Sequence, residues 1–524
     1  NALSAVGLAS LLALGAGPGA ALAQVAANAT PQGGKLVAGQ ANWQQSGTSL
    51  TVNQGSSRAA IDWTSFDIGR NASVVFRQPD ANSVALNRVT GGAPSQIFGR
   101  LSANGQVFLT NAAGVYFSPT AQVDVGALVA TTGSLGTDDF MAGRWTFNRA
   151  GSTASVVNEG RLNAAPGGYV ALLAPEVRNA GVITAQAGTV ALAAGEAVEL
   201  QFNGGSLAKL RVTPAQVATL VENRQAILAP DGQILMSARA AQALHDGVIR
   251  DSGELSASSL VAKGGRIVLE ADRVDIASGA SIRATGATGG GQINIGGNYQ
   301  GQGELWNATT TRIASGASID ASATRQGDGG NVVVWANDRT DFNGRISARG
   351  GALGGNGGVV ETSGKQTLNV RTGRVDVSGS AQGGKGGTWL LDPNDLTIGT
   401  GSNTNITGSF GTTDDGAFLS TASLAAALTN GSNVVVLTNS GGSNLGHGDI
   451  NVNGAITTSL AASQSATLTL AAQGDINIAS GGSIAAGGAN RSLNVNLYAG
   501  TQLGGGSPGS VASQISMSSG TSIN

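Results

Sequence analysis

The sequence has no cysteine and only two histidines, His245 and His447, which lie far apart in the chain. Disulfides, cysteine metal sites and a histidine-rich metal cluster are therefore excluded. Charged residues make up 11% of the chain, against about 25% in ordinary globular proteins, and the net charge is −2. Because nucleic-acid-binding domains carry a basic surface, we expect no nucleic-acid partner.

Aromatic residues are also scarce, at 4%, whereas glycine contributes 82 of the 524 residues. The glycines do not fall at every third position, so the sequence is not collagen-like. A near-zero net charge and 41% apolar residues argue against a chain that is disordered through charge. A long, glycine-rich and weakly charged chain is typical of an extended repeat fold rather than of a compact enzyme.

The N-terminal segment has the composition of a secretory signal. Residues 2–16 are small and apolar, and residues 21–23 (Ala-Leu-Ala) resemble a cleavage site. We interpret residues 1–23 as the remnant of a signal peptide, so we expect the mature chain to be exported. The repeat pattern breaks off at residues 520–524, and we expect this end to be the cut end of a longer protein.

A repeat becomes visible when the chain is compared with itself. An Asn or Asp is followed four residues later by an apolar residue, and a Gly-x-apolar run comes next. The unit occurs at Asn158 and Leu162, Asn179 and Ile183, Asn223 and Ile227, and Asp251 and Leu255. The three asparagines either form a hydrogen-bonded ladder or each occupy a left-handed turn, and the sequence leaves both alternatives open.

The repeat continues with longer steps toward the C-terminus. Pairs that are 13 residues apart flank glycine-rich stretches, and we interpret them as recurring strand positions: Ile319 and Val332, Ile346 and Val359, and Val375 and Thr388. Residues 448–452 return as residues 474–478, a step of 26. Repeats of 20–29 residues suit one coil of a parallel β-helix.

Each repeat contains short runs of alternating apolar and polar residues, the pattern of a half-buried strand. Such strands become stable when successive coils stack identical positions and bury a continuous core. With strands about 4.8 Å apart, roughly 15 to 20 coils would form a rod of about 70–95 Å. β-Propellers and β-sandwiches are the competing architectures, but a propeller blade needs a longer unit of about 40 residues.

One segment predicts a helix that interrupts the coils. Thr213 is a suitable N-cap, Pro214 suits the first turn, and residues 215–222 are good helix formers. We therefore expect a short helical excursion at residues 213–222, packed against the rod.

Three consecutive blocks, at residues 87–101, 103–117 and 121–132, resemble the secretion (haemagglutination activity) domain of filamentous haemagglutinin-like exoproteins. The resemblance covers roughly residues 30–200. Residues 357–365 and 388–394 also resemble segments of these large exoproteins. The resemblance implies an all-β, right-handed parallel β-helix with an N-terminal cap. It also implies export from a Gram-negative bacterium through an outer-membrane transporter with periplasmic binding domains, which is two-partner secretion.

The resemblance supplies candidate residues of the secretion motif, which are polar, proline or glycine positions in the three blocks. They are Asn87, Gly91, Pro94, Ser95, Gly99, Asn104, Gly105, Asn111, Gly114, Asp124 and Gly126. Where the family has an Asn-Pro-Asn-Gly block, this chain reads Asn111-Ala-Ala-Gly114, so the central Pro-Asn is replaced. Because the domain must fold as the cap of a β-helix, structural and secretory roles can coincide at these positions.

These observations predict four regions. Residues 1–23 are the signal remnant, and residues 24–205 are the secretion domain that caps the β-helix. Residues 206–390 are β-helix repeats with the helical excursion. Residues 391–524 are further repeats, truncated at the C-terminus.

Catalytic and metal-binding patterns are weak. The carboxylate pairs Asp138-Asp139 and Asp414-Asp415 lie in Gly/Thr-rich loops and are more typical of solvated turns. Arg339 separates Asp338 from Asp341, which disfavours a calcium site. Residues 289–295 lack the strand-to-helix context of a phosphate loop. We therefore expect no enzymatic activity, cofactor or metal.

The favoured function is that of a secreted or surface-exposed adhesin, a monomeric rod whose turns contact a host-cell, matrix or biofilm ligand. Two alternatives stay open. One is capture of haem or haemopexin, a use known among relatives of the family. The other is a carbohydrate-active β-helix enzyme, which would need at least three acids converging in a groove.

Overall fold

The computed structural model describes residues 25–241, 246–400, 417–438, 448–461, 464–487, 492–500 and 513–523. The predicted signal remnant at residues 1–23 lies outside the described residues, as do both histidines and the Asp414-Asp415 pair. Within the described residues the regular secondary structure is almost entirely β-strand, with the short helices α1 (Thr137–Ala142), α2 (Thr421–Thr429) and η1 (Tyr299–Gly301).

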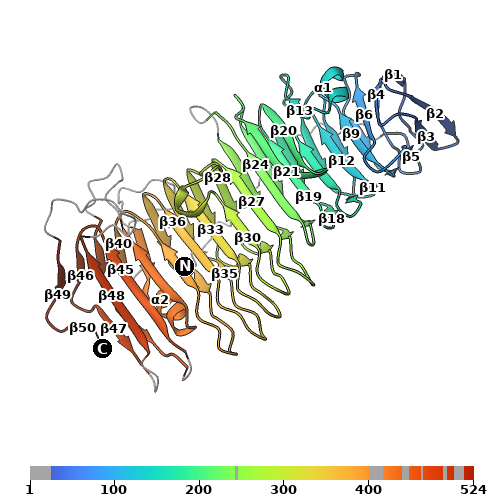
Figure 1. The fold of residues 1–524 in the computed structure, drawn as a ribbon. Helices are drawn as coiled ribbons and strands as arrows, with labels where there is room; N and C mark the ends of the chain where they lie inside the picture. The colour runs from blue at the N-terminus through green and yellow to red at the C-terminus, as the bar shows by residue number, and fades with distance from the viewer. Residues whose placement is uncertain are drawn as a thin grey trace, which may run out of the picture.

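The strands form three long sheets that run side by side along an elongated rod (Figure 1). In the coils from β6 to β38 the chain passes through sheet 1, sheet 2 and sheet 3 in turn, and then returns to sheet 1 beside its previous strand. Beyond the N-terminal cap, neighbouring strands within each sheet are parallel, which confirms the parallel β-helix. At about 4.8 Å per strand, the sixteen strands of sheet 1 span roughly 70 Å.

Sheet 1 contains β1 (Lys35–Ala38), β4 (Arg58–Trp63), β6 (Val84–Val89), β9 (Gln106–Thr110), β12 (Ala127–Thr131), β16 (Tyr169–Leu173), β19 (Thr189–Ala194), β24 (Gln233–Ala238), β27 (Arg266–Ala271), β30 (Gln292–Ile295), β33 (Asn331–Ala336), β36 (Val359–Gly364), β39 (Thr388–Leu391), β42 (Asn433–Leu437), β45 (Ala466–Ala472) and β48 (Leu493–Ala499). Sheet 2 contains β7 (Ser95–Ile97), β10 (Val115–Phe117), β14 (Ser155–Asn158), β17 (Glu176–Asn179), β22 (Thr219–Asn223), β25 (Gly247–Asp251), β28 (Arg273–Ile276), β31 (Thr310–Ile313), β34 (Arg339–Phe342), β37 (Thr367–Val370), β41 (Ala417–Ser420), β40 (Leu396–Gly399), β43 (Ile450–Val452), β46 (Ile476–Ile478) and β49 (Ile515–Met517).

Sheet 3 contains β2 (Ala41–Ser46), β3 (Ser49–Gln54), β5 (Ser73–Arg77), β8 (Arg100–Ala103), β11 (Gln122–Val125), β15 (Arg161–Ala164), β18 (Val182–Ala185), β23 (Ala226–Leu228), β26 (Glu254–Ser256), β29 (Ser281–Arg283), β32 (Ser318–Asp320), β35 (Arg345–Ser347) and β38 (Arg374–Asp376). Two small sheets add β13 (Thr146–Asn148), β20 (Ala197–Asn203) and β21 (Ser206–Thr213), and β44 (Ala455–Thr458), β47 (Ser483–Ala486) and β50 (Ser522–Ile523).

The N-terminal end of the rod is closed by antiparallel strands, as expected for a cap. β1 pairs antiparallel with β4, and β2 pairs antiparallel with β3. Trp43 of β2 packs against the buried Trp63 of β4, with 5.3 Å between the ring centroids. Such a cap covers the open edge of the first parallel coil, which would otherwise be a site of aggregation.

The predicted repeat positions stack in register inside the rod. Leu162, Ile183, Ile227 and Leu255 are direct neighbours in successive strands of sheet 3, and none of them is exposed to solvent. One hydrophobic cluster continues from Leu50 to Ile484. The predicted boundaries after residues 205 and 390 fall within this continuous core, and they stay a prediction.

The asparagines of the repeat form the hydrogen-bonded ladder. Asn158 Nδ2 donates to Asn179 Oδ1 over 2.8 Å, and Asn179 Nδ2 donates to Asn223 Oδ1 over 2.8 Å. Asn223 Nδ2 donates to Asp251 Oδ1 over 2.8 Å, so the ladder ends on a carboxyl group. All four side chains are buried, and none of these residues has a positive φ, so the turn alternative is wrong.

The helix predicted at residues 213–222 is wrong. Thr213 ends β21, Ala215 forms a parallel bridge to Ala240, and Thr219–Asn223 is strand β22. β22 pairs with β17 on one side and with β25 on the other. Helix propensity is a weak local preference, and these two sets of strand hydrogen bonds override it.

Two of the predicted 13-residue pairs are out of register by one residue. Val332 of β33 stacks on Val360, which in turn stacks on Trp389. Val359 is 38% exposed, and it aligns with Thr388 on the outer face. The glycine-rich loops before β36 and β39 each contain one residue more than the sequence comparison assumed. The residue whose side chain points into the core therefore lies one position later in each strand.

A column of glycines marks the corner where each coil enters sheet 1. In nine successive coils, a Cβ atom added to the glycine would lie within 2.6 Å of the carbonyl oxygen of the glycine before it. The column consists of Gly105, Gly126, Gly168, Gly188, Gly232, Gly265, Gly291, Gly330, Gly358 and Gly387. None of these glycines has a φ in the left-handed region, so glycine is required here by the close approach of two backbones.

Replacing one member of the glycine column should destabilise the rod. The Cβ atom of Gly232→Ala would lie 2.1 Å from the carbonyl oxygen of Gly188, so two coils must move apart. We expect a loss of about 1–3 kcal/mol, measured by urea unfolding followed by circular dichroism. Gly92→Ala is the matched control, because no atom lies within 4 Å of its added Cβ. Equal stability of the two variants would contradict the close-packed corner.

The carboxyl group that ends the asparagine ladder should make stability depend on pH. Burial raises the pKa of Asp251 from 3.8 to about 7, although hydrogen bonds from Asn223 and from the Gly253 N–H oppose this shift. Between about pH 4 and 7 the folded chain keeps a proton that the unfolded chain releases, so stability falls as the pH rises.

Asp251→Asn should therefore raise the urea midpoint at pH 8 and change it little at pH 4. Some pH dependence should remain, because burial also raises the pKa of Glu361 to about 7. The exposed Asp338→Asn serves as control and should leave the profile unchanged. A profile for Asp251→Asn identical to that of the unmodified chain would contradict the burial of an acid in the ladder.

Candidate functional site

The candidate secretion residues lie in the first coils of the rod, where the structure brings some of them together and separates others. Pro94, Ser95, Asn111 and Gly114 meet at one corner between sheets 1 and 2. Asn104, Gly105 and Gly126 lie at a second corner, between sheets 3 and 1. Asn87, Gly91, Gly99 and Asp124 each have separate surroundings.

The first corner is built by the side chain of Asn111, which is 1% exposed. Its Nδ2 donates to Ala93 O and to Ser95 Oγ, both over 3.0 Å, which ties it to the preceding coil. Its Oδ1 accepts the Ala113 N–H over 2.9 Å, and its carbonyl accepts the Gly114 N–H over 3.0 Å. Residues 111–114 thus form a hydrogen-bonded turn, which we call the Asn111 turn.

The Asn111 turn keeps the two family positions that its geometry requires. Gly114 has a φ of +120°, which favours glycine, and its carbonyl accepts the Ser95 N–H over 3.0 Å. Ala112 is exposed, and its carbonyl accepts a hydrogen bond from Ser152 Oγ over 2.7 Å. The replacement of Pro-Asn by Ala-Ala therefore falls at the outer part of the turn, whereas the residues that close it are kept.

A tyrosine hydrogen bond lies beside the Asn111 turn. Tyr116 of β10 donates its hydroxyl hydrogen to Glu159 Oε2 over 2.5 Å, and its ring packs edge-to-face on Phe98. Burial, together with this hydrogen bond and the charge of Glu159, raises the pKa of Tyr116 to about 12. The hydroxyl therefore stays protonated at neutral pH and links two successive coils as a donor.

The second corner depends on glutamines that the sequence analysis missed. Asn104 pairs with the backbone of Gln78, accepting its N–H and donating to its carbonyl, both over 2.8 Å. Gln78 Nε2 donates to Gln54 Oε1 over 3.1 Å, while its Oε1 accepts the Gly105 N–H over 3.1 Å. The glutamine amides thus continue this second corner, where the glycine column begins, toward the N-terminal cap. A single glutamine after a strand carries no local signal that would have shown this.

The remaining candidate residues make hydrogen bonds or close backbone contacts within the rod. Asn87 is fully buried, and its Oδ1 accepts the Trp63 indole N–H over 3.0 Å. Gly91 and Gly99 lie where an added Cβ would meet a carbonyl oxygen of another segment at 2.2 Å. Asp124 is exposed on sheet 3 and accepts a hydrogen bond from Asn163 over 2.9 Å.

The outer face of sheet 1 carries an additional layer that the sequence analysis also missed. Helix α1 and strands β13, β20 and β21 cover it, and they enclose a second hydrophobic cluster. Phe108 of β9 contacts Phe140, Trp145 and Phe147 of this layer, with centroid distances of 5.1–6.4 Å. The concentration of aromatic residues at 140–147, in a chain with 4% aromatics, is the signal that could have identified it.

Two of the acids considered in the sequence analysis, Asp139 and Asp341, form ion pairs with arginine. Asp138 and Asp139 lie in the first turn of α1, where carboxylates suit the helix dipole, and Asp139 forms an ion pair with Arg144. Asp341 forms an ion pair with Arg339 over 2.9 Å. In the described part of the chain, no three His, Cys, Asp or Glu side chains are grouped so that they could hold a metal ion.

Comparison with known proteins identifies a family for the N-terminal half. The family described as TPS secretion domain matches residues 27–284. The crystal structure of the HMW1 secretion domain from Haemophilus influenzae matches with a TM-score of 0.52 and 28% sequence identity. The match covers 69% of this chain and 100% of the HMW1 domain.

Two curated relatives are also similar, and both are named heme/hemopexin-binding protein, from Haemophilus influenzae. One is 35% identical over 260 residues, which is 48% of this chain and 28% of the relative. The other is 30% identical over 292 residues, which is 51% of this chain and 31% of the relative. The chain thus spans less than a third of the length of these relatives. Together with the capped β-helix, these matches show that residues 27–284 are a TPS secretion domain, the domain that marks exoproteins of two-partner secretion.

Proposed function

We propose that the capped first coils act as the export signal of this chain. Their partner would be an outer-membrane transporter that binds the chain in the periplasm through its soluble domains. The observation that carries the proposal is the match of the TPS secretion domain to residues 27–284, in which the cap and the Asn111 turn lie. An N-terminal signal remnant at residues 1–23 fits the same route as the first step of export.

The stacked architecture suits a route on which the chain folds after crossing the outer membrane. Each coil makes most of its contacts with its two neighbours, so folding can spread one coil at a time. Coils that fold outside the cell cannot slip back through a narrow pore. In this proposal, formation of successive coils drives the chain outward.

Outside the cell we propose that the rod serves as an attachment surface rather than as an enzyme. The turns between strands can vary in sequence without loss of the stacked core, so they can present a ligand-binding surface along the rod. The carboxylate pair Asp138-Asp139 lies in the first turn of a helix, and Asp139 forms an ion pair with Arg144. Within the described residues, no helix has the length and apolar character needed to cross a membrane.

Capture of haem or haemopexin is the second candidate function. It is supported by the names of the two relatives, both heme/hemopexin-binding proteins. The similarity involves less than a third of each relative, so most of each relative has no counterpart in the match.

Export should depend on both the transporter and the Asn111 turn. When the chain is produced in a Gram-negative host, we expect it in the medium only if the outer-membrane transporter is co-expressed. Asn111→Ala removes three side-chain hydrogen bonds of a buried residue, so it should destabilise the first coils by about 1–3 kcal/mol and lower the secreted amount. Quantitative immunoblots of medium and periplasm measure the result.

Asn163→Ala is the matched control, because its amide makes an exposed hydrogen bond in the same region. Transporter-independent appearance of the chain in the medium would refute the proposed route. Normal export of Asn111→Ala would refute the role of the turn only.

The two proposed extracellular functions differ in a direct binding experiment. An attachment protein should leave the absorption spectrum of added haem unchanged, whereas its deletion should reduce adherence to host cells or biofilm formation. A saturable shift of the haem absorption band, or binding of haemopexin, together with normal adherence of the deletion strain, would reverse the assignment.

A further inference from the structure

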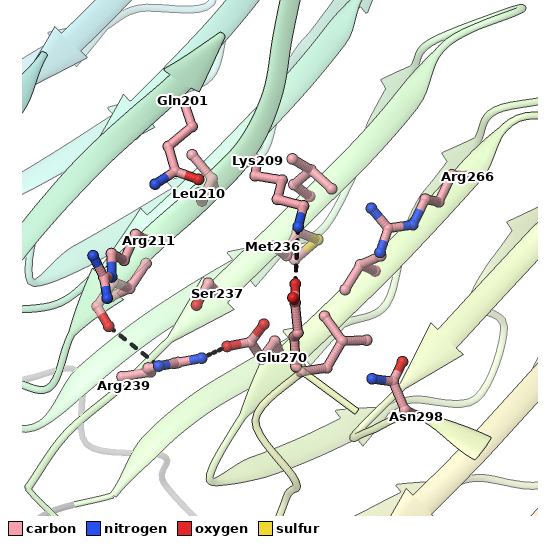
Figure 2. A pocket seen from close by; sticks show the side chains of 15 residues that line it. Gln201, Lys209, Leu210, Arg211, Met236, Ser237, Arg239, Arg266, Glu270 and Asn298 are labelled. Atoms are coloured by element: carbon pink, nitrogen blue, oxygen red, sulfur yellow. Dashed lines mark hydrogen bonds and ion pairs between the residues drawn. The ribbon is translucent and has the colours of Figure 1, made fainter. Parts of the chain in front are cut away.

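A groove lies on the outer face of sheet 1, next to the hairpin formed by β20 and β21. It has a volume of about 680 Å³. One bank is β21 at residues 209–212, the floor is formed by β24 and β27, and the other bank is the segment at residues 298–305. Figure 2 shows the side chains that line the groove, with Arg211 and Arg266 on opposite sides.

β21 is an edge strand whose free side faces this groove. In the described residues it pairs with β20 only. Side chains of sheet 1 occupy part of its free edge, since Gln233 donates to the carbonyls of Leu207 and Ala208, and Arg239 donates to that of Val212. These bonds hold both ends of the free edge against sheet 1.

The middle of the free edge has its backbone groups available. Leu200 pairs with Leu210 across the hairpin, but the Leu200 N–H donates to Trp145 on the opposite side. The pair is therefore of the non-hydrogen-bonded type, and Leu210 directs its N–H and C=O toward the groove. An unpaired strand edge with a donor and an acceptor is a template for an added strand.

The lining of the groove is basic. It contains Lys209, Arg211, Arg239 and Arg266 against two acids, Glu270 and Glu304, in a chain whose net charge is −2. Both acids are engaged, because Glu270 forms an ion pair with Arg239 and Glu304 forms one with Lys209. In the part of the chain that the structure describes, Arg211 and Arg266 have no ion pair.

The floor combines apolar side chains with polar atoms that lack partners. Leu235 and Val268 are neighbours on the outer face of sheet 1, and they are 7% and 4% exposed. Ser237 Oγ and Arg239 Nε are buried atoms of the lining without a hydrogen-bond partner. The lining thus offers apolar contact, hydrogen bonds and positive charge along one edge strand.

We propose that this groove binds an extended acidic peptide segment of a partner protein, which adds as a strand to the free edge of β21. The backbone of Leu210 would pair with the peptide, and every second side chain would contact Leu235 and Val268. Acidic side chains on the peptide would pair with Arg211 and Arg266. The inference is independent of the proposed export route.

The test uses the purified full chain and a fluorescent peptide of eight residues, alternating glutamate and valine, with blocked ends. We expect saturable binding by fluorescence anisotropy, and no binding of the matched lysine–valine peptide. Arg211→Glu and Arg266→Glu should each weaken binding at least tenfold, because each reverses a charge in the groove. Arg345→Glu, an exposed position on sheet 3, should bind as the unmodified chain does.

Strand addition is tested separately from charge. A peptide with proline at its two central positions lacks an N–H on both edges and should lose binding, whereas the same peptide with alanine there should keep it. Hydrogen exchange of the Leu210 amide should become at least tenfold slower when the peptide is bound.

Equal binding of the proline peptide, or unchanged exchange at Leu210, would overturn strand addition. Failure of the acidic peptide to bind would overturn the site. Stronger binding of an acidic oligosaccharide, such as oligogalacturonate, would assign the groove to a carbohydrate instead.

Discussion

The rod depends on one geometric constraint: each coil must bring its backbone against the same stretch of backbone in the coil before it. At the entry to sheet 1 this contact is so close that a Cβ atom on Gly188 or Gly232 would lie about 2 Å from a carbonyl oxygen. The column of glycines therefore fixes the register of sheet 1 at the start of each strand. Because a shift of one residue would turn every inward side chain outward, this corner also determines which residues form the core.

The same stacking explains the low charge of the chain and the kinds of polar group in its interior. A buried position recurs in each coil, so a charge placed there would face another at the distance between strands. An uncharged asparagine avoids this repulsion, because the side-chain amide of Asn179 accepts a hydrogen bond from Asn158 and donates one to Asn223. On the outer face, an additional layer that includes Phe140 and Trp145 packs on sheet 1.

The sequence was sufficient to predict those parts of the structure that follow from the periodicity of the repeat. It predicted the parallel β-helix and the stacking of Leu162, Ile183 and Ile227. It failed where long-range contacts decide: β22 is a strand because β17 and β25 flank it, and Val359 faces outward because of loop lengths. The resemblance supplied Asn111 as a candidate residue, but its bonds to Ala93 and Ser95 join separate coils and have no sequence signal. The groove beside β21 likewise depends on how a hairpin packs on sheet 1.

The most direct test of the stacked rod is a set of distances between successive coils. Because the chain has no cysteine, spin labels can be attached to pairs of introduced cysteines in the outward-facing column of sheet 3. Arg100→Cys combined in turn with Ser281→Cys, Ser318→Cys and Arg345→Cys spans six, seven and eight coils. Pulsed electron resonance should give distances near 29, 34 and 38 Å, a rise of about 4.8 Å per coil. Distances that follow the number of intervening residues, or broad distributions, would contradict the account.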